Sequence, residues 1–280
     1  MRPFRPNEAG YVGPGQTFMR TDLVLDPTEL TGADVVILGA PFDEGVTYRP
    51  GTRFGPRAIR QADHAGVWSR THMDAGIDAR AALTIYDYGD IEVIPADLLA
   101  SHALLRETIS TIQKTGAISI VLGGDHSLSA PVMQGLADVH GSDGYAIIHF
   151  DTHADTGFEG GMTIDHGTPF YRGVNEGFMR GENIFQIGLR GCWPNPSEFD
   201  WMRANGFHWR TMDEVMERGL NAVVDEAIAF AQSRAPRVYL TVDIDVLDPA
   251  FAPGTGTPEP GGLSTRELLP VIRRIARTVN

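Results

Sequence analysis

Short apolar runs alternate with helical periodicity along most of the chain. Six runs of five or six residues are nearly continuous in apolar side chains, as is typical of strands covered on both faces of a sheet. We predict strands at residues 34–39, 83–88, 118–122, 145–150, 183–187 and 238–242. Their alternation with helical segments predicts an α/β fold, a three-layer α/β/α sandwich with a mostly parallel central sheet.

Helix signals lie between these runs. Residues 95–114 open with Pro-Ala-Asp and end before Gly116, and Ser264 followed by Glu267 forms a capping box. We predict helices at residues 95–114, 128–139, 196–205, 222–233 and 265–276. Residues 1–32 are rich in Pro, Gly and polar side chains and predict an N-terminal arm. The rest, residues 33–280, carries no repeat or linker and predicts one domain.

Composition narrows the class of protein. The net charge of −13 argues against a nucleic-acid partner, because phosphate binding needs a basic field. The single cysteine, Cys192, excludes an intrachain disulfide and a multi-thiolate metal site. The N-terminus has no apolar signal region, and no stretch approaches the roughly 18 apolar residues of a membrane span. We therefore expect a cytoplasmic protein that does not contact membranes.

Three polar motifs each follow a predicted strand. They are GGDHS at residues 123–127, DTHAD at 151–155 and DID at 243–245. Parallel sheets bind ligands at the carboxyl ends of their strands. Alternate side chains of an extended chain share one side, so Asp151 projects with His153, and Asp155 joins them if the chain stays extended. The same spacing groups Asp243 with Asp245.

This pattern indicates a metal centre. Taken alone, Asp245 would be a turn residue and His126 a polar loop residue. Together the motifs supply four carboxylates and two imidazoles, and such carboxylates repel one another unless a cation neutralises them. Oxygen and imidazole ligands without sulfur suit manganese or another borderline divalent ion. Six ligands exceed the needs of one catalytic ion, so we expect a pair of ions about 3.5–4 Å apart.

The motifs resemble those of the ureohydrolase family, which includes agmatinases, arginases, guanidinobutyrases and proclavaminate amidinohydrolase. The resemblance extends to DIDVLDPAFAPGTGTPEPGG at residues 243–262 and YRPGTRFGPRAIR at residues 48–60. It implies an arginase-like fold, two Mn²⁺ ions per subunit and a homo-oligomer, either trimer or hexamer. It also implies hydrolysis of a small cationic guanidino substrate to urea and an amine. Agmatine, which would give putrescine, is favoured; guanidinobutyrate, guanidinopropionate and other guanidino acids are alternatives.

The resemblance also assigns roles to residues. One manganese would be held by His126, Asp151, Asp155 and Asp243, and the other by Asp151, His153, Asp243 and Asp245. Asp155 would also orient the attacking hydroxide, and His166 would carry a proton to the leaving amine. The Thr257 hydroxyl would contact the guanidinium group.

Three further residues near the motifs have no single predicted role. His149 either lies beside the site or belongs to the core. Asp125 and Asp248 are expected to support the ligands or the local backbone rather than to bind metal.

The sequence departs from the family in one respect. Family members carry a further strand with a glutamate that recognises the guanidinium group, followed by a last helix, and the 280 residues hold no counterpart. A weakly active or inactive metal-binding homologue is therefore one alternative. Another is a deacetylase-like hydrolase of the same general fold, which would bind a single zinc ion.

Overall fold

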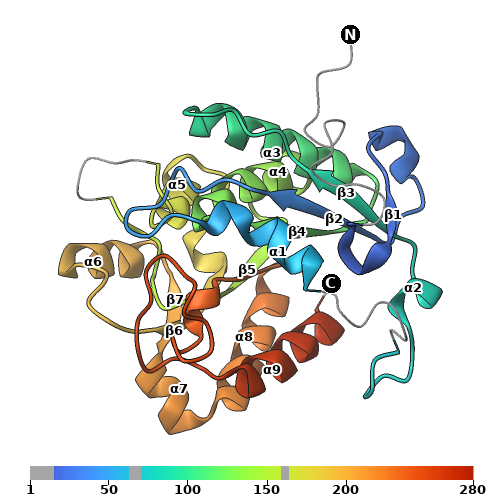
Figure 1. The fold of residues 1–280 in the computed structure, drawn as a ribbon. Coiled ribbons are helices and arrows are strands. Elements are labelled where there is room, and N and C mark those ends of the chain that lie inside the picture. The colour runs from blue at the N-terminus through green and yellow to red at the C-terminus, as the bar shows by residue number, and fades with distance from the viewer. Residues whose placement is uncertain (1–15, 63–70, 159–163, 280) are drawn as a thin grey trace. The chain divides into compact units, whose positions relative to one another are not determined.

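The computed structural model describes residues 16–62, 71–158 and 164–279 (Figure 1). Residues 1–15 of the predicted N-terminal arm, which spans residues 1–32, lie outside this part of the chain. The chain divides into two compact units. The first is Met1–Gly45 with Pro50–Gly135, and the second is Val46–Arg49 with Leu136–Asn280. Each unit contains one parallel sheet of four strands.

The sheet of the first unit has the strand order β1-β3-β2-β4, and all its pairs are parallel. Its strands are β1 (Asp22–Leu23), β2 (Val35–Ala40), β3 (Ile85–Asp90) and β4 (Ile118–Gly123). The apolar runs predicted β2, β3 and β4 to within two residues. The sequence did not predict β1, which is a two-residue strand inside the predicted arm.

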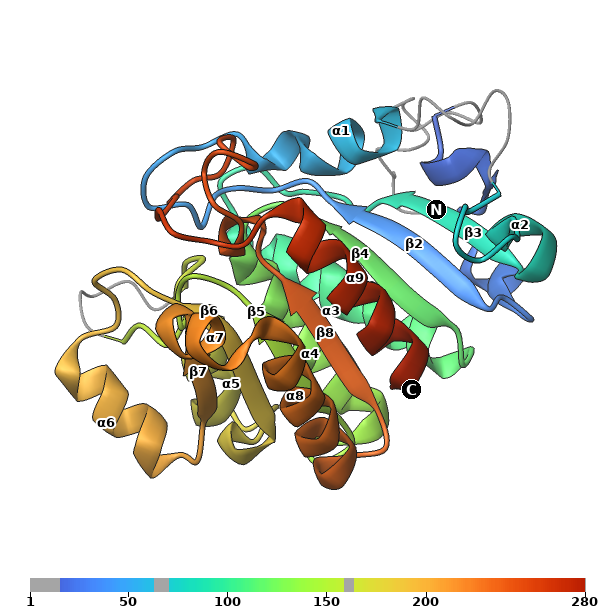
Figure 2. The ribbon, with the colours of Figure 1, turned by 90° about the horizontal axis from the view of Figure 1, so that it is seen from below.

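Helices cover both faces of this sheet. They are α1 (Gly55–Gln61), α2 (Ala79–Ala82), α3 (Leu98–Lys114) and α4 (Ser129–His140), with 3-10 turns at Phe18–Arg20, Pro27–Leu30, Thr52–Phe54 and His126–Leu128. Helices α1 and α3 pack against β4 from opposite faces of the sheet (Figure 2). Asp97 caps α3 by accepting a hydrogen bond from the Ala100 amide, so the helix begins after the predicted Pro95.

Strand β4 differs from the expectation of a strand covered on both faces. Ile118 is 65% exposed and Ile120 is 42% exposed. Within the described residues β4 pairs only with β2, so it forms an edge of this sheet. A strand at the edge of a sheet has fewer neighbours to cover its side chains. The apolar run of β4 therefore predicted more burial than these two residues have.

The sheet of the second unit has the strand order β7-β6-β5-β8, again all parallel. Its strands are β5 (Ala146–Phe150), β6 (Ile184–Leu189), β7 (His208–Thr211) and β8 (Val238–Val242). The sequence predicted all of these except β7. That strand reads His-Trp-Arg-Thr, which lacks the apolar run by which the other strands were recognised.

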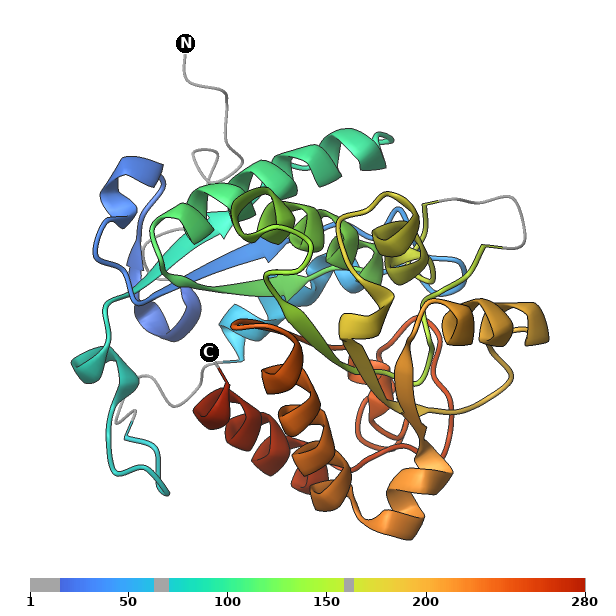
Figure 3. The same cartoon turned by 180° about the vertical axis from the view of Figure 1, so that it is seen from behind.

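Five helices surround this sheet in the described chain. They are α5 (Pro169–Asn175), α6 (Pro196–Ala204), α7 (Met212–Arg218), α8 (Leu220–Arg234) and α9 (Thr265–Thr278), with 3-10 turns at Gly181–Asn183 and Ile244–Val246. Helix α8 packs against β5 and β6, and α9 lies beside α8 (Figure 3). Their apolar faces meet the sheet in a core that includes Ile148, Phe185, Val224 and Ile275. The predicted capping box at Ser264 and Glu267 is present and begins α9.

The chain contains no candidate for a membrane-crossing helix among the described residues.

The register of the second sheet brings the ends of β5 and β8 level with each other, beside β6. Phe150 of β5 pairs with Ile187 of β6 and with Val242 of β8. The polar segments that begin at Asp151 and Asp243 therefore leave the sheet at the same edge. This is the edge at which parallel sheets bind ligands.

Candidate metal centre

Backbone hydrogen bonds fix the two acidic segments beside each other. The Asp151 amide donates to the Ile187 carbonyl at 3.1 Å, and the Asp243 amide donates to the Phe150 carbonyl at 2.9 Å. Gly188 has a φ of +106°, and a Cβ there would lie 3.0 Å from the Asp151 carbonyl oxygen. Glycine at that position permits the turn of β6 to pass close to the start of the Asp151 segment.

Asp151, His153 and Asp245 form one potential ligand group. One ligand atom from each lies within 4.8 Å of the others. His153 Nδ1 is 3.2 Å from Asp245 Oδ2 and 3.7 Å from Asp151 Oδ1. Both carboxylates are buried and the imidazole is half-buried. The carboxylates also accept backbone hydrogen bonds, Asp151 from the His153 amide at 2.7 Å and Asp245 from the Thr152 amide at 3.2 Å.

The neighbouring negative charges shift the pKa values of Asp245 and His153. Burial, together with the charges of Asp151 and Asp243, raises the pKa of Asp245 to about 9. Burial lowers the pKa of His153, but the hydrogen bond to Asp245 and the nearby carboxylates outweigh burial and raise it. Buried carboxylates that repel one another in this way are matched by a bound cation.

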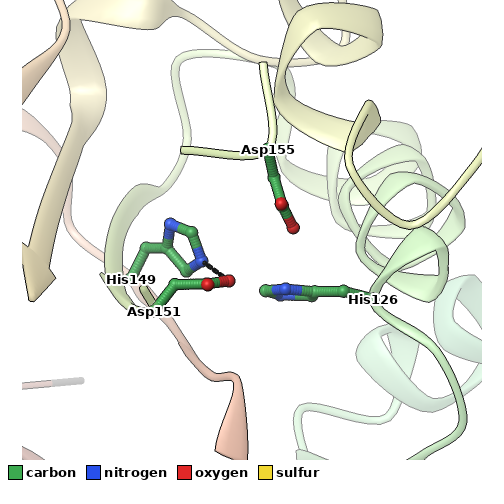
Figure 4. Close-up of side chains that lie close together, drawn as sticks. All are labelled: His126, His149, Asp151 and Asp155. Carbon is green, nitrogen blue, oxygen red and sulfur yellow. Dashed lines mark hydrogen bonds and ion pairs between the residues drawn. The ribbon is translucent and has the colours of Figure 1, made fainter. Parts of the chain in front are cut away.

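Asp155 and His149 also lie close to Asp151 (Figure 4). Ligand atoms of these three residues lie within 4.8 Å of one another. His149 Nε2 is 2.8 Å from Asp151 Oδ2, and the imidazole is fully buried. Asp155 has a φ of +52°, so the segment does not stay extended as the sequence spacing assumed. The positive φ turns the Asp155 carboxylate back toward Asp151, at a conformational cost of about 1–3 kcal/mol that is common at functional sites.

Asp243 belongs to neither of these ligand groups. Its Oδ1 accepts a hydrogen bond from the Asp245 amide at 2.9 Å, so Asp243 caps the 3-10 turn Ile244–Val246. Asp243 and Asp245 were expected to project from the same side of an extended chain, but a 3-10 turn takes the place of the extended segment. The charge of Asp243 nevertheless acts on both Asp245 and His153.

His126 and Asp125 belong to the first unit. They lie just after β4, where His126 begins a 3-10 turn and is buried. Asp125 caps this turn through a 2.9 Å hydrogen bond from the Ser127 amide, and its other oxygen accepts from the Gly45 amide at 2.9 Å. The structure thus gives Asp125 the backbone-supporting role that the sequence suggested.

His166 lies in the loop before α5 and is half-buried. Its Nε2 is 2.6 Å from the Thr47 hydroxyl. Thr257 is half-buried in the glycine-rich loop that follows β8, at residues 253–262. Asp248 shapes the same loop, because its carboxylate accepts hydrogen bonds from the amides of Ala250 at 2.9 Å and Gly261 at 2.8 Å.

Arg190 joins this loop to the turn that carries Asp245. Its Nη2 donates to the carbonyl oxygens of Asp245 at 2.7 Å and Glu259 at 2.8 Å. Its other nitrogens donate to Gly188 and Pro260 carbonyls at 3.3 and 3.0 Å. The guanidinium group therefore binds main-chain oxygens from three segments and holds Asp245 and the glycine-rich loop at fixed positions.

Comparison with known proteins now identifies the family. Residues 33–280 match the family model described as Arginase family. The chain belongs to the arginase family. It is 42% identical to proclavaminate amidinohydrolase of Streptomyces clavuligerus over 259 residues, which are 92% of this chain and 80% of that protein. It is 36% identical to guanidinobutyrase of Pseudomonas aeruginosa, over 97% of this chain and 84% of that protein.

The solved structures agree with this assignment. A hypothetical agmatinase from Burkholderia thailandensis has a TM-score of 0.83 to this arginase-family chain at 35% identity, covering 96% of this chain and 81% of that chain. These similarities confirm the predicted α/β fold of arginase type. They also make this chain a hydrolase of the amidinohydrolase kind.

The sequence did not predict three residues that structure this arginase-family site: Thr47, Gln186 and Arg190. Gln186 carried a signal, because it is the one polar side chain in the apolar strand Ile184–Leu189. Thr47 and Arg190 carried none, since a threonine in a loop and an arginine after a strand are common in any protein.

Proposed function

We propose that this chain hydrolyses a guanidino compound to urea and an amine at a centre of two manganese ions, with agmatine as substrate and putrescine as product. The observation that carries the proposal is the group of Asp151, His153 and Asp245 at the carboxyl edge of a parallel sheet, in which both carboxylates are buried and the imidazole is half-buried. Membership of the arginase family makes hydrolysis of this kind the expected chemistry.

The donor set fits manganese. Its atoms are carboxylate oxygens and imidazole nitrogens, and Cys192 is exposed on the loop after β6. Asp151 and Asp243 would each serve both ions. His126 and Asp155 would complete the first ion, and His153 and Asp245 the second. When bound, such a pair of ions lowers the pKa of a water so that it can attack the guanidinium carbon near neutral pH.

The protein's own side chains would then complete the reaction. Asp155 would accept a hydrogen bond from the attacking water and orient it. His166 would carry a proton to the departing amine nitrogen, which must leave as a neutral amine. Thr47 would fix the His166 ring, because its hydroxyl lies 2.6 Å from Nε2. The Thr257 hydroxyl would contact the guanidinium group.

A second substrate class has support from Arg49. This exposed residue stands two positions after Thr47, and its guanidinium carbon lies 5.1 Å from the centre of the Tyr48 ring. Its carbonyl oxygen lies against Gly256, where a Cβ would be 3.3 Å away, so the segment borders the glycine-rich loop. A guanidinium group at this border is suited to pair with a substrate carboxylate. Guanidinobutyrate, guanidinopropionate or another guanidino acid is therefore the alternative to agmatine.

Urea release from a panel of guanidines tests the proposal. Purified protein loaded with Mn²⁺ is assayed with agmatine, guanidinobutyrate, guanidinopropionate and arginine, before and after chelation. We expect urea from one member or more, and loss of that activity with the metal. Two bound ions per chain without urea from any substrate would overturn the proposal in favour of a metal-binding homologue without turnover. A single zinc per chain would instead favour the deacetylase-like alternative.

The variant Arg49→Met separates the two substrate classes. If the substrate is a guanidino acid, loss of a charge-assisted hydrogen bond of about 1.5–3 kcal/mol raises KM by roughly 10–100-fold. If the substrate is agmatine, which carries an ammonium at that end, removal of Arg49 leaves KM unchanged or lowers it. Arg57→Met is the matched control, because Arg57 is an exposed arginine of α1.

A further inference from the structure

Gln186 is a fully buried amide in the middle of β6. Its Nε2 atom lies 2.7 Å from the Ala154 carbonyl oxygen and 3.0 Å from Nδ1 of His149. Ala154 precedes Asp155 in the metal-binding segment, and His149 pairs with Gln186 across the β5–β6 ladder. The Gln186 side chain thus bridges a strand and the segment that leaves it.

The Ala154 carbonyl fixes which way the amide points. A carbonyl oxygen only accepts hydrogen bonds, so the NH₂ group of Gln186 must face it. The same NH₂ group has a second hydrogen, which is directed at Nδ1 of His149. Nδ1 is therefore an acceptor and carries no proton. In a neutral imidazole the proton then lies on Nε2, which is 2.8 Å from Asp151 Oδ2.

We propose that Gln186 is a positioning residue for the metal centre, acting through His149 on the carboxylate of Asp151. Gln186 selects the tautomer in which the Nε2–H of His149 donates to Asp151 Oδ2. The other oxygen, Oδ1, accepts from the His153 amide at 2.7 Å. With a donor on each oxygen the carboxylate plane is fixed, while lone pairs stay available for ions. This inference rests on the proposed role of Asp151 as a ligand of both ions.

The same geometry removes His149 from the set of metal ligands. Its position within 4.8 Å of the Asp151 and Asp155 oxygens is that of a ligand. Both of its ring nitrogens, however, are engaged by Gln186 and Asp151. Its ring also packs against Phe170, with 4.5 Å between ring centres, and the Phe170 amide donates to the Asp155 carbonyl at 3.1 Å. His149 and Gln186 are therefore placed to hold both Asp151 and the Asp155 segment.

Affinity for Mn²⁺ tests this relay independently of turnover. Metal-free protein is titrated with MnCl₂ for the wild type, Gln186→Met, His149→Phe and the double variant, with thermal unfolding measured for each. Loss of a partner behind a metal ligand typically weakens metal binding by about 10–100-fold, and we expect losses in this range for both single variants. Because Gln186 acts through His149, the double variant should bind no more weakly than His149→Phe.

Gln113→Met is the matched control. Gln113 donates to the Ser119 hydroxyl at 3.1 Å in the first unit, whereas Gln186 and His149 belong to the second. It should leave the Mn²⁺ affinity unchanged. A folded Gln186→Met with wild-type Mn²⁺ affinity, or a double variant whose losses simply multiply, would overturn the inference. A wild type that binds no Mn²⁺ would instead contradict the proposed function, and the inference with it.

If Gln186→Met does not fold, nitrogen NMR of the histidine rings can still test the tautomer of His149. In metal-free wild-type protein labelled with ¹⁵N-histidine, the His149 signals are those absent from the His149→Phe spectrum. We expect an unprotonated Nδ1 and a protonated Nε2. The opposite tautomer would refute the relay without any use of the Gln186 variant.

Discussion

The Thr47 hydroxyl lies 2.6 Å from Nε2 of His166, which joins residues 119 positions apart in the chain. Both residues belong to the second compact unit. Thr47 lies in the short segment Val46–Arg49, whose neighbours in sequence on both sides belong to the first unit. A histidine that transfers a proton must hold one ring orientation while it does so. The hydrogen bond between Thr47 and His166 is suited to fix that orientation.

Replacement of Thr47 tests its role in catalysis. Thr47→Val keeps the shape but removes the hydroxyl, and we expect kcat to fall by about 10-fold or more, below the 10²–10⁴-fold that loss of an acid–base group causes. KM should change little if the hydroxyl acts only on the orientation of the His166 ring. Thr47→Ser keeps the hydroxyl and should restore most of kcat. Equal rates for the Val and Ser variants would show that the hydroxyl has no part in turnover.

Asp243 is the sharpest test of the two-metal arrangement, because it stands outside both ligand groups of the structure. If it is shared by two ions, Asp243→Ala should release both and abolish urea formation while the protein stays folded. Asp243→Asn keeps an acceptor for the Asp245 amide and separates loss of charge from loss of the turn. Metal content is measured by elemental analysis after dialysis. Asp143→Ala, at an exposed aspartate paired with Arg180, is the control. Two retained ions in Asp243→Ala would exclude a bridging role.

Arg190 is expected to hold the turn at Asp245 and the glycine-rich loop together. Arg190→Met leaves the carbonyls of Asp245 and Glu259 without their donor, and unmet buried acceptors cost about 1–3 kcal/mol each. Arg190 is half-buried, so water recovers part of this, and we expect roughly 2–4 kcal/mol of lost stability. KM should rise as the loop loosens. Thermal unfolding of the metal-free protein and steady-state kinetics measure the two effects. Arg203→Met, at an exposed arginine of α6, should change neither.

Arg60 stabilises the first unit through a buried ion network. Its side chain is 2% exposed, and the guanidinium group binds Asp87 at 2.9 Å and Asp90 at 2.5 Å. Arg60→Met strands two carboxylates in the interior and should cost about 3–5 kcal/mol. Calorimetry of the metal-free protein checks this, with the exposed Arg57→Met as the matched control. A variant as stable as the wild type would show that water reaches these carboxylates.

Glu226 provides a test of stability against pH. Burial raises its pKa, but hydrogen bonds from Arg210 and Arg218 outweigh burial and lower it. A lowered pKa in the folded state contributes stability above the unfolded value of about 4.3 and loses it as pH falls through the folded value. Glu226→Gln should therefore be less stable than the wild type at pH 7, by under about 1 kcal/mol, since the pair is partly exposed. The difference should vanish in acid, and a difference that persists there would rule out an ionic cause.

Local sequence determined most of the strands and helices, because their signals lie within a few neighbouring residues. Apolar runs predicted β5, β6 and β8, and the Ser264–Glu267 pair predicted the start of α9. The same logic located the acidic segments, since parallel strands in register end at one edge. Asp151 and Asp245 could be predicted to lie near each other for that reason. The sequence did not predict β7, because its side chains are polar or amphipathic. Its pairing with β6 makes it a strand.

Tertiary structure alone decided how the site is supported. Gln186 meets His149 across 37 residues, and Arg190 meets the Glu259 carbonyl across 69. Such contacts depend on which strands pair and on how loops fold back, and no short pattern encodes them. The turn at Asp155 is of the same kind, because its positive φ is imposed by the surroundings rather than by a glycine. The sequence thus determined which chemical groups arrive at the edge of the sheet. Packing and hydrogen bonding over long sequence distances decided their orientation and protonation.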